Sequence, residues 1–427
     1  MPQSLLGPFP DSPGYEKAKK LDAEDPLAHF KQRFVIRDPE LIYLDGNSLG
    51  RQPLEARATL LDVLDTQWGD RLIRSWNEGW WELQLELGDR LAPIIGALPG
   101  EVVISDATSV NLYKLAESSV RARPDRSRII TDDLNFPTDV YVLDGIARAH
   151  NLELVIVESD GINGPIEDLF AAIDQDTALV SLSHTVFKSG FTYEMKEINQ
   201  IAHAAGALTL WDTSHSVGVV PIDLEGSGSD LAVGCTYKYL NSGPGSPAFL
   251  YVRKALQAQL ENPIAAWWAH ANPFDFDLEF EPVAGIRKFH TGTMPILSLA
   301  GVGAGIAEAA GAGITAIREK SILLTELLIE LWETELVDLG FGLASPREPE
   351  NRGSHVSLTH SEGYQITRAL IEIGKVIPDF RAPDNIRFGL SPLYTSFTNV
   401  HTASVRMQQI VESQLYRELE FSRHTIT

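Results

Sequence analysis

The sequence predicts an α/β protein in which a mainly parallel sheet carries helices on both faces, with a smaller α+β region towards the C-terminus. From about residue 128 to residue 252, short β-branched runs alternate with amphipathic stretches that are long enough to be crossover helices. Beyond about residue 295 this alternation is replaced by a long amphipathic stretch and short isolated strands. No repeat with a period of about 20–50 residues is present, which excludes a solenoid.

The alternating region contains six short strands and two helices between them. Helical spacing of apolar residues marks Thr138–His150 and Glu194–Ala205. Because crossovers of this length connect parallel strands, we expect βαβ units and a sheet covered on both faces. The six predicted strands are Arg128–Thr131, Leu154–Glu158, Ala178–Ser183, Ala207–Trp211, Leu231–Gly234 and Ala248–Val252.

The C-terminal region has a different pattern. Ser321–Leu339 reads as one strongly amphipathic helix, and a loop rich in Pro, Arg and Glu follows at Ser345–Arg352. Short strands are expected around His355–Leu358 and Ile386–Leu390. Together these elements predict a second, smaller α+β domain.

The N-terminal region offers one strand candidate, Leu41–Leu44, followed by a turn at Asp45–Gly50 (DGNSLG). We expect residues 1–50 to contribute to the small domain and to the active site. Residues 51–300 are predicted to form the large domain, and residues 301–427 the small C-terminal domain.

Composition excludes several classes of protein. The 427 residues carry 35 Lys and Arg against 58 Asp and Glu, and a net charge of -23 opposes binding to nucleic acid. The longest apolar stretch, Pro295–Ala310, is too short and too interrupted to span a membrane. The only cysteine, Cys235, can form neither an intramolecular disulfide nor a cysteine-based zinc site. Met1–Gly14 does not resemble a signal peptide, so we expect a cytoplasmic protein.

Polar residues follow the predicted strand Ala207–Trp211. Asp212, Ser214 and His215 stand where this strand ends, and ligands of open α/β sheets bind at the carboxyl ends of strands. An aspartate there could pair with the protonated pyridine nitrogen of pyridoxal phosphate. The same residues could equally cap a helix or a loop.

A lysine follows the next predicted strand. Lys238 lies after Leu231–Gly234 and before the Gly-rich stretch Asn241–Ser246. A lysine beside a cationic cofactor loses its proton more easily and can form a Schiff base with an aldehyde. Most lysines are solvated surface groups, but the spacing of 26 residues from Asp212 allows one strand and a connection, which places both residues at one sheet edge.

Small hydroxyl residues precede another predicted helix. Thr108 and Ser109 belong to the stretch Asp106–Asn111, just before the helix-like Leu112–Val120. Backbone N–H groups at a helix start bind phosphate, although an ordinary N-cap would have the same residues. Neither a P-loop nor a dinucleotide-binding glycine motif is present.

Two further features are interpreted as structural. The histidines do not form a spaced pair typical of a metal site, so no metal is expected. The cluster Trp76, Trp80 and Trp81 is more typical of a core than of a ligand cage. Cys235 is expected to be a small buried residue at a strand end.

With these residues side by side, the chain resembles the kynureninases, which are fold-type-I pyridoxal-phosphate hydrolases, and in particular the bacterial ones. The resemblance runs nearly end to end, and the order and spacing of its motifs are highly specific. The motifs are Leu41–Gly50 (LIYLDGNSLG), Trp68–Asn77 (WGDRLIRSWN), Asn135–Asp139 (NFPTD), Gly234–Ser246 (GCTYKYLNSGPGS), Gly292–Leu297 (GTMPIL), Arg352–Val356 (RGSHV) and Ile386–Tyr394 (IRFGLSPLY).

This resemblance implies a fold with a mainly parallel seven-stranded sheet and a set of site residues. Lys238 would bind pyridoxal 5′-phosphate covalently, Asp212 would hold its pyridine nitrogen, and Tyr237 would be a catalytic acid or base. The substrate α-carboxylate would be bound by Arg387, and the rest of the substrate by Trp76, Asn47 and Ser48. The remaining cofactor contacts would come from Thr108, Ser109, Phe136, Asp139, Ser183, His215, Trp267 and Thr293.

The resemblance also implies the reaction and the assembly. Hydrolysis of the Cβ–Cγ bond of an L-kynurenine would give L-alanine and an anthranilate, in tryptophan catabolism or in NAD biosynthesis. The family builds its active sites at the interface of a homodimer, with Thr293 donated by the second subunit. The alternatives to this function are an aminotransferase or lyase with the same cofactor, and a scaffold protein without activity. A cysteine desulfurase is disfavoured because Cys235 is expected at a strand end, where it cannot swing over a substrate.

The chain departs from the bacterial pattern near the cofactor. Val186-Phe187 replaces an Asn-Tyr pair, and Thr213-Ser214 replaces a Leu-Ala pair. The runs Ala266–His270 and Arg287–Thr291 differ as well. These departures leave open whether the pocket prefers kynurenine, 3-hydroxykynurenine or another ring-substituted form.

Overall fold

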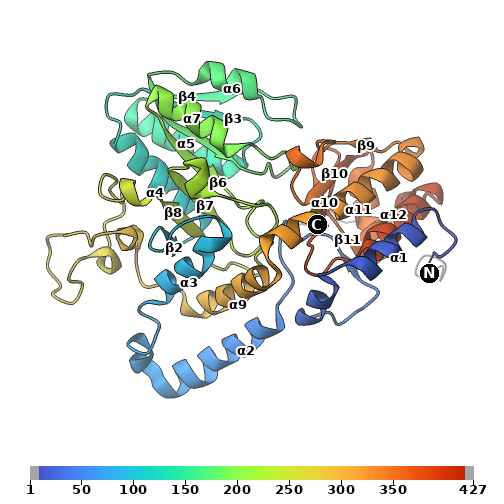
Figure 1. The fold of residues 1–427 in the computed structure, drawn as a ribbon, viewed down its shortest axis with the longest axis horizontal. Coiled ribbons are helices and arrows are strands. Elements are labelled where there is room, and N and C mark those ends of the chain that lie inside the picture. Colours follow the sequence, from blue (N-terminus) through green and yellow to red (C-terminus); the bar gives the residue numbers. More distant parts are fainter. Residues whose placement is uncertain (1–8, 419–427) are drawn as a thin grey trace.

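A seven-stranded sheet forms the centre of the larger part of the molecule in the structure, a computed structural model that describes residues 9–418 (Figure 1). The strand order is β2-β8-β7-β6-β5-β3-β4, and β8 alone runs antiparallel to its neighbours. The predicted sheet, with seven mainly parallel strands, is thereby confirmed. The strands are β2 (Val102–Ile104), β3 (Arg128–Asp132), β4 (Glu153–Val157), β5 (Thr177–Ser183), β6 (Leu208–Asp212), β7 (Leu231–Gly234) and β8 (Phe249–Val252).

Both faces of this sheet are buried. Successive side chains of a strand point to opposite faces, and Leu231 and Val233 of β7 belong to one hydrophobic cluster while Ala232 belongs to another. The first cluster includes apolar residues of α4 and α5, and the second includes those of α3, α7 and α9. The bounds are α3 (Leu83–Leu91), α4 (Thr108–Arg121), α5 (Pro137–His150), α6 (Ile166–Ala172), α7 (Met195–Ala205), α8 (Leu224–Ser227) and α9 (Ile296–Ala312).

The predicted crossover helices are confirmed to within one residue, whereas the predicted helix Ser321–Leu339 begins seven residues too late. Helix α10 spans Ile314–Leu331, and a π-helical turn and a 3₁₀ turn continue it up to Leu339. The earlier start has a tertiary cause, since Ile317 is buried and the Lys320 ammonium lies 2.7 Å from the Asp25 carboxylate.

The C-terminal part contains a second, antiparallel sheet with the order β12-β13-β10-β9 and a hydrophobic core of its own. Segments near the N-terminus join it: β1 (Ile42–Tyr43) pairs in parallel with β11 (Val376–Ile377), and the Asp22 carboxylate accepts hydrogen bonds from the first N–H groups of α12. The other elements are α1 (Tyr15–Glu24), α2 (Leu54–Asp62), β9 (Gly342–Leu343), β10 (His355–Thr359), α11 (Gly363–Glu372), β12 (Asp379–Arg381), β13 (Asn385–Gly389), α12 (Phe397–Glu412) and α13 (Leu415–Glu418).

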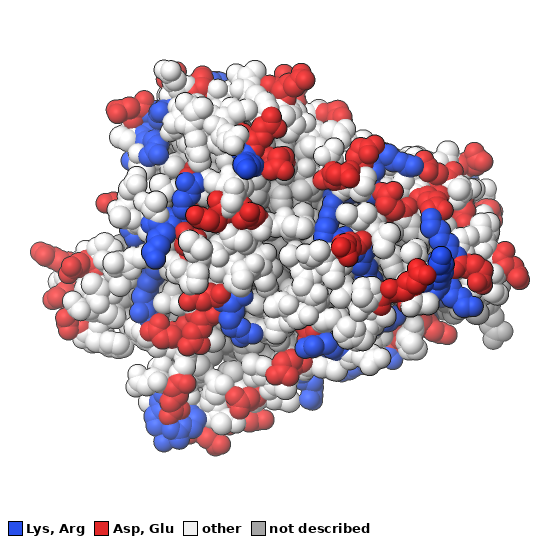
Figure 2. All heavy atoms as spheres, viewed as in Figure 1, with Lys and Arg blue, Asp and Glu red and all other residues white. Residues whose placement is uncertain are grey.

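The domain boundaries at residues 50/51 and 300/301 stay predictions, and the expectations for residues 1–8 and 419–427 lie outside the described residues. Between residues 9 and 418, no single helix is long and apolar enough to cross a membrane. The pair α9 and α10 would reach that length only together, and it bends by 81° at the break between them. Acidic and basic side chains are interspersed over the face shown in Figure 2.

Candidate active site

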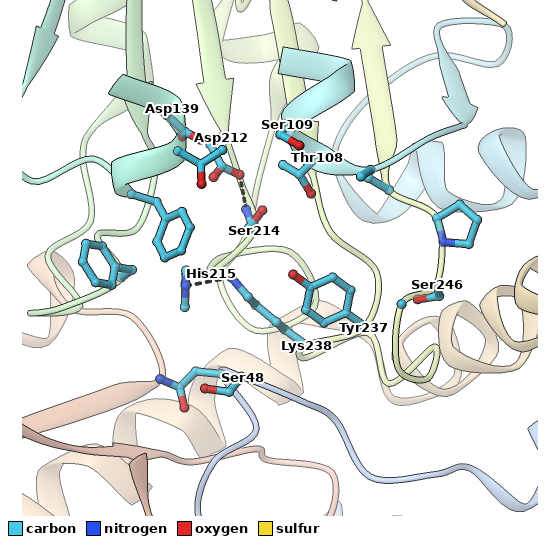
Figure 3. A pocket seen from close by; sticks show the side chains of 18 of the residues that line it. Ser48, Thr108, Ser109, Asp139, Asp212, Ser214, His215, Tyr237, Lys238 and Ser246 are labelled. Atoms are coloured by element: carbon cyan, nitrogen blue, oxygen red, sulfur yellow. Dashed lines mark hydrogen bonds between the residues drawn. The ribbon is translucent and has the colours of Figure 1, made fainter. Parts of the chain in front are cut away.

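A cavity of about 480 Å³ lies at the carboxyl ends of β6 and β7, beside the N-terminal end of α4 (Figure 3). The large sheet contributes Asp212 and Lys238 to its lining, and β13 of the small sheet contributes Arg387. Residues near the N-terminus, Asn47 and Ser48, line it as well. The cavity has the size typical of small-molecule sites and stands at the sheet edge where such ligands bind.

Lys238 points into this cavity and contacts His215. The distance between Lys238 Nζ and His215 Nε2 is 2.9 Å (Figure 3). Burial lowers the pKa of His215 well below its usual value, and the neighbouring Lys238 and His355 lower it further. The imidazole is therefore neutral and can accept a hydrogen bond from the Lys238 amine, which fixes the position of Nζ.

Two aspartates lie together deeper in the cavity. Asp212 is the last residue of β6, and its Oδ1 accepts a hydrogen bond of 2.8 Å from the Ser214 N–H. Burial, together with the adjacent Asp212, raises the pKa of Asp139 on α5 well above its usual value. Like charges so close together cannot both be ionised. Asp139 is therefore protonated and donates a hydrogen bond to Asp212.

The start of α4 faces the same cavity with Thr108 and Ser109. The N-cap residue is Ala107, whose side chain has no oxygen, so these hydroxyls do not serve as the N-cap. The first N–H groups of a helix have no acceptor within the helix and attract an anion. Beside them, the ammonium of the fully buried Lys114 lies 2.8 Å from the Asp106 carboxylate and balances its charge.

Two aromatic side chains line the wall. The Phe136 ring, 42% exposed, stands edge-on to the Phe187 ring with 5.2 Å between centroids. Tyr237 precedes Lys238, and the pKa of its hydroxyl is raised by the adjacent Cys235 and by burial. The Tyr237 hydroxyl therefore stays protonated at neutral pH and can act as a proton donor.

Arg387 is held in place by several acceptors at the opposite wall. Its Nε donates to Asp379 Oδ2 at 2.8 Å, and its Nη2 donates to the same oxygen and to Ser48 Oγ, the latter at 3.2 Å. Its Nη1 donates to the carbonyl of Phe187. The side-chain amide of Asn47 is buried, and neither its oxygen nor its nitrogen has a partner among the described residues.

Four predicted site residues do not line the cavity of this chain. Ser183 lies one strand away, in register with Asp212. Trp76 and Trp267 belong to an aromatic cluster around Trp268, with ring centroids 5.3 Å and 4.7 Å from it. Thr293 is exposed just before α9.

The sequence reasoning missed several residues of the lining. Ser246 lies in the Gly-rich stretch after Lys238, and glycines alone do not indicate which residue of that stretch would face the cavity. Asp106 stands directly before the predicted phosphate-binding helix start. Nothing local distinguishes Arg381, which lines the cavity because the pairing of β12 with β13 brings it beside Arg387.

Comparison with known proteins decides the family. A kynureninase of Pseudomonas fluorescens is 44% identical over 418 residues, which cover 95% of this chain and 98% of the relative. The chain belongs to the kynureninase family. A kynureninase of Burkholderia pseudomallei is 42% identical with the same coverage of both chains, and a family model described as the kynureninase C-terminal domain matches residues 317–407.

Solved structures show how widely the fold of this kynureninase-family chain is shared. A cysteine desulfurase from Thermococcus onnurineus matches with a TM-score of 0.77 at 19% identity, covering 92% of this chain and 98% of its own. The Escherichia coli cysteine desulfurase CsdA matches with a TM-score of 0.77 at 15% identity, covering 91% and 98%. At these identities the likeness concerns the fold alone. In this chain the single cysteine, Cys235, is buried.

Proposed function

We propose that this chain hydrolyses the Cβ–Cγ bond of L-kynurenine, or of a ring-substituted form such as 3-hydroxy-L-kynurenine. The products are L-alanine and the corresponding anthranilate. The observation that carries this proposal is the meeting of Lys238, Asp212 and Arg387 around one cavity, in a chain 42–44% identical to kynureninases over 95% of its length. The family and the site thus point to one reaction.

The residues around the cavity fit pyridoxal 5′-phosphate. Lys238 offers a primary amine to its aldehyde, and the Asp212 carboxylate suits a protonated pyridine nitrogen. The start of α4, with Thr108 and Ser109, suits its phosphate, and the exposed face of Phe136 suits its ring. When bound, this cofactor supplies an electron sink for negative charge at the substrate Cα.

The chain's own residues supply binding and proton movement. Arg387 binds the α-carboxylate through its two-pronged guanidinium group. Lys238 Nζ, held by His215, would accept the proton from the substrate Cα. The protonated Tyr237 hydroxyl provides a proton as water adds to the γ-carbonyl and the anthranilate leaves.

A homodimer with shared active sites accounts for the residues that lie outside the cavity. We infer that Thr293 and Trp267 complete the cofactor site of the second subunit, and that Trp76 lines the pocket for the aromatic ring. The stretch between residues 270 and 283 extends from the body (Figure 1, yellow) and exposes Phe276 and Leu278, which favours burial against another copy. A cytoplasmic role in tryptophan catabolism or NAD biosynthesis fits the same residues.

Turnover tests the reaction. Purified, cofactor-loaded protein is assayed on L-kynurenine and on 3-hydroxy-L-kynurenine, with alanine and the aromatic product measured together. Equal amounts of alanine and an anthranilate support hydrolysis, and the ratio of the two kcat/KM values identifies the preferred ring. Transfer of the amino group to a keto acid, or no cleavage of either substrate, would contradict the proposal.

Two variants test the residues. Lys238→Ala is expected to lose the visible absorbance band of the bound cofactor, and retention of that band would refute the role of Lys238. Mixing inactive Lys238→Ala chains with inactive Thr293→Ala chains is expected to restore about a quarter of the activity, because half of the random dimers hold one intact site. Activity that stays absent would argue against shared sites.

A further inference from the structure

Arg387 belongs to a buried cluster of charged side chains. Asp379 of β12 stands directly opposite Arg387 of β13, and both side chains are at most 2% exposed. Asp379 Oδ2 accepts from Arg387 and also lies 3.0 Å from the Arg381 Nη2. Both arginines line the cavity. One carboxylate is therefore shared by two guanidinium groups that face the substrate site.

A second carboxyl group, that of Asp45, lies against this cluster. Asp45 forms a β-bridge with Gly389, the last residue of β13, and its residue surface is 9% exposed. Its Oδ1 is buried and has no hydrogen-bond partner within residues 9–418. Burial, together with the negative charge of Asp379, raises the pKa of Asp45 to about 7, although Ser48 and the two arginines oppose the shift.

The charged and titratable side chains around the Asp45 carboxyl come from several elements of the fold. The charged groups are those already described, and the remaining titratable groups are tyrosines, whose hydroxyls stay neutral because burial raises their pKa values. These tyrosines are Tyr43 on β1, Tyr239 in the loop after Lys238 and Tyr394 after β13.

Ionisation of Asp45 near neutral pH therefore changes the net charge of the cluster by one unit. With Asp45 protonated, Arg381 and Arg387 exceed the single Asp379 carboxylate by one positive charge. With Asp45 ionised, two carboxylates balance two guanidinium groups. A substrate carboxylate binds more tightly to the first state than to the second, because unbalanced charge in a partly buried site attracts a counter-charge.

We propose that Asp45 is a positioning residue for the substrate's α-carboxylate: in its protonated form it leaves Arg381 and Arg387 with one unbalanced positive charge that attracts the carboxylate, and its ionisation as the pH rises weakens substrate binding. This role deepens the proposed function, since it concerns the same site. It acts through Arg387 and requires no contact between Asp45 and the reacting atoms.

The test is the pH dependence of KM for L-kynurenine in the unmodified enzyme and in Asp45→Asn, both loaded with cofactor. Asparagine has the shape of a protonated aspartate but cannot ionise. We expect the two KM values to agree at pH 6 and the unmodified enzyme's KM to become about tenfold larger than that of Asp45→Asn at pH 8.5, which corresponds to a coupling of one pKa unit. The kcat values are expected to stay alike.

The ratio of the two KM values isolates Asp45 from other titrating groups, which act equally in both proteins. Asp338→Asn, which neutralises an exposed aspartate, is the control and is expected to give a ratio of one throughout. A ratio for Asp45→Asn that does not change with pH overturns the proposal and leaves the proposed reaction standing.

A second measurement tests the role of Asp45 independently of whether the protein cleaves kynurenine. L-Alanine carries the same α-carboxylate, and its binding to the loaded protein is followed by the absorbance spectrum of the cofactor. Its Kd is expected to show the same pH-dependent ratio between the two proteins, even if no kynurenine is cleaved. If Asp45→Asn does not fold, a Kd of the unmodified protein that stays constant from pH 6 to pH 8.5 overturns the proposal on its own.

Discussion

A single methyl group added to Gly305 is expected to displace the loop that carries Lys238. Gly305 lies in the middle of α9, where a Cβ atom would stand 1.8 Å from the carbonyl oxygen of Leu240 and 2.9 Å from Ser242 Oγ. The first contact is with backbone, so no side-chain rotation can relieve it. The loop after Lys238 would have to retreat by at least about 1 Å to restore a normal contact.

The change in stability caused by Gly305→Ala follows from two opposing contributions to the free energy of unfolding. Overpacking of a closed interior costs about 1–3 kcal/mol, and alanine gains about 1 kcal/mol over glycine in a helix interior. Gly311 on the same helix provides the matched control, because its Cβ would find nothing closer than 3.9 Å. We expect Gly311→Ala to be neutral or stabilising, and Gly305→Ala to lie about 1–3 kcal/mol below it in stability.

The assays are thermal unfolding and steady-state turnover of both loaded variants. For a chain of this length, 1 kcal/mol corresponds to about 1 °C in Tm, so the variants should differ by about 1–3 °C. The larger effect is expected in kcat/KM, since a displacement of about 1 Å at a reacting group can cost about a hundredfold. If Gly305→Ala matched Gly311→Ala in both assays, the close packing of α9 on this loop would not position Lys238.

Three further outcomes follow from other contacts. The Asp45→Asn apoprotein should be as stable as the unmodified apoprotein near pH 4 and more stable by about 2–4 kcal/mol at pH 8. The reason is that folding raises the pKa of the Asp45 carboxyl from about 4 to about 7, so the unmodified protein loses stability as the pH rises through that range. Denaturant titration at both pH values measures the difference in free energy of unfolding, and the same difference at both would refute the prediction. Arg387→Lys should raise KM for L-kynurenine about ten- to a hundredfold in steady-state assays, since lysine loses the fork that binds a carboxylate. Arg352→Ala should cost about 3–5 kcal/mol in unfolding experiments, because the fully buried guanidinium donates to two backbone carbonyls and to Glu326; a loss below 1 kcal/mol would contradict this.

Local patterns were sufficient to predict one wall of the site. Lys238 and Asp212 follow neighbouring parallel strands, and periodicity located both strands to within one residue. The helix was expected to start at Leu112, but α4 begins at Thr108, so the hydroxyl residues form its first turn instead of preceding it. These features depend on short-range order, in which strand ends and helix starts determine where side chains point.

The opposite wall depends on strand register and on long-range contacts, which no local pattern contains. Asp379 and Arg387 are only eight residues apart and meet through the register of β12 and β13, whereas Asp45 reaches the cluster from more than 300 residues away. Strand β2 escaped prediction because Val102–Ile104 is too short to show alternation. The roles of Arg387, Asn47 and Ser48 came from the family resemblance, since an isolated arginine or amide carries no specific meaning in a sequence.

The pairing of β1 with β11 constrains the order in which the protein can mature during synthesis. Ile42 leaves the ribosome 334 residues before its partner Val376. The strands that present Asp212 and Lys238 are complete more than 100 residues earlier, and domains generally fold as they emerge. The nascent chain can therefore assemble the cofactor side of its active site well before the side that recognises substrate, and the site is complete only after the later strands have joined it.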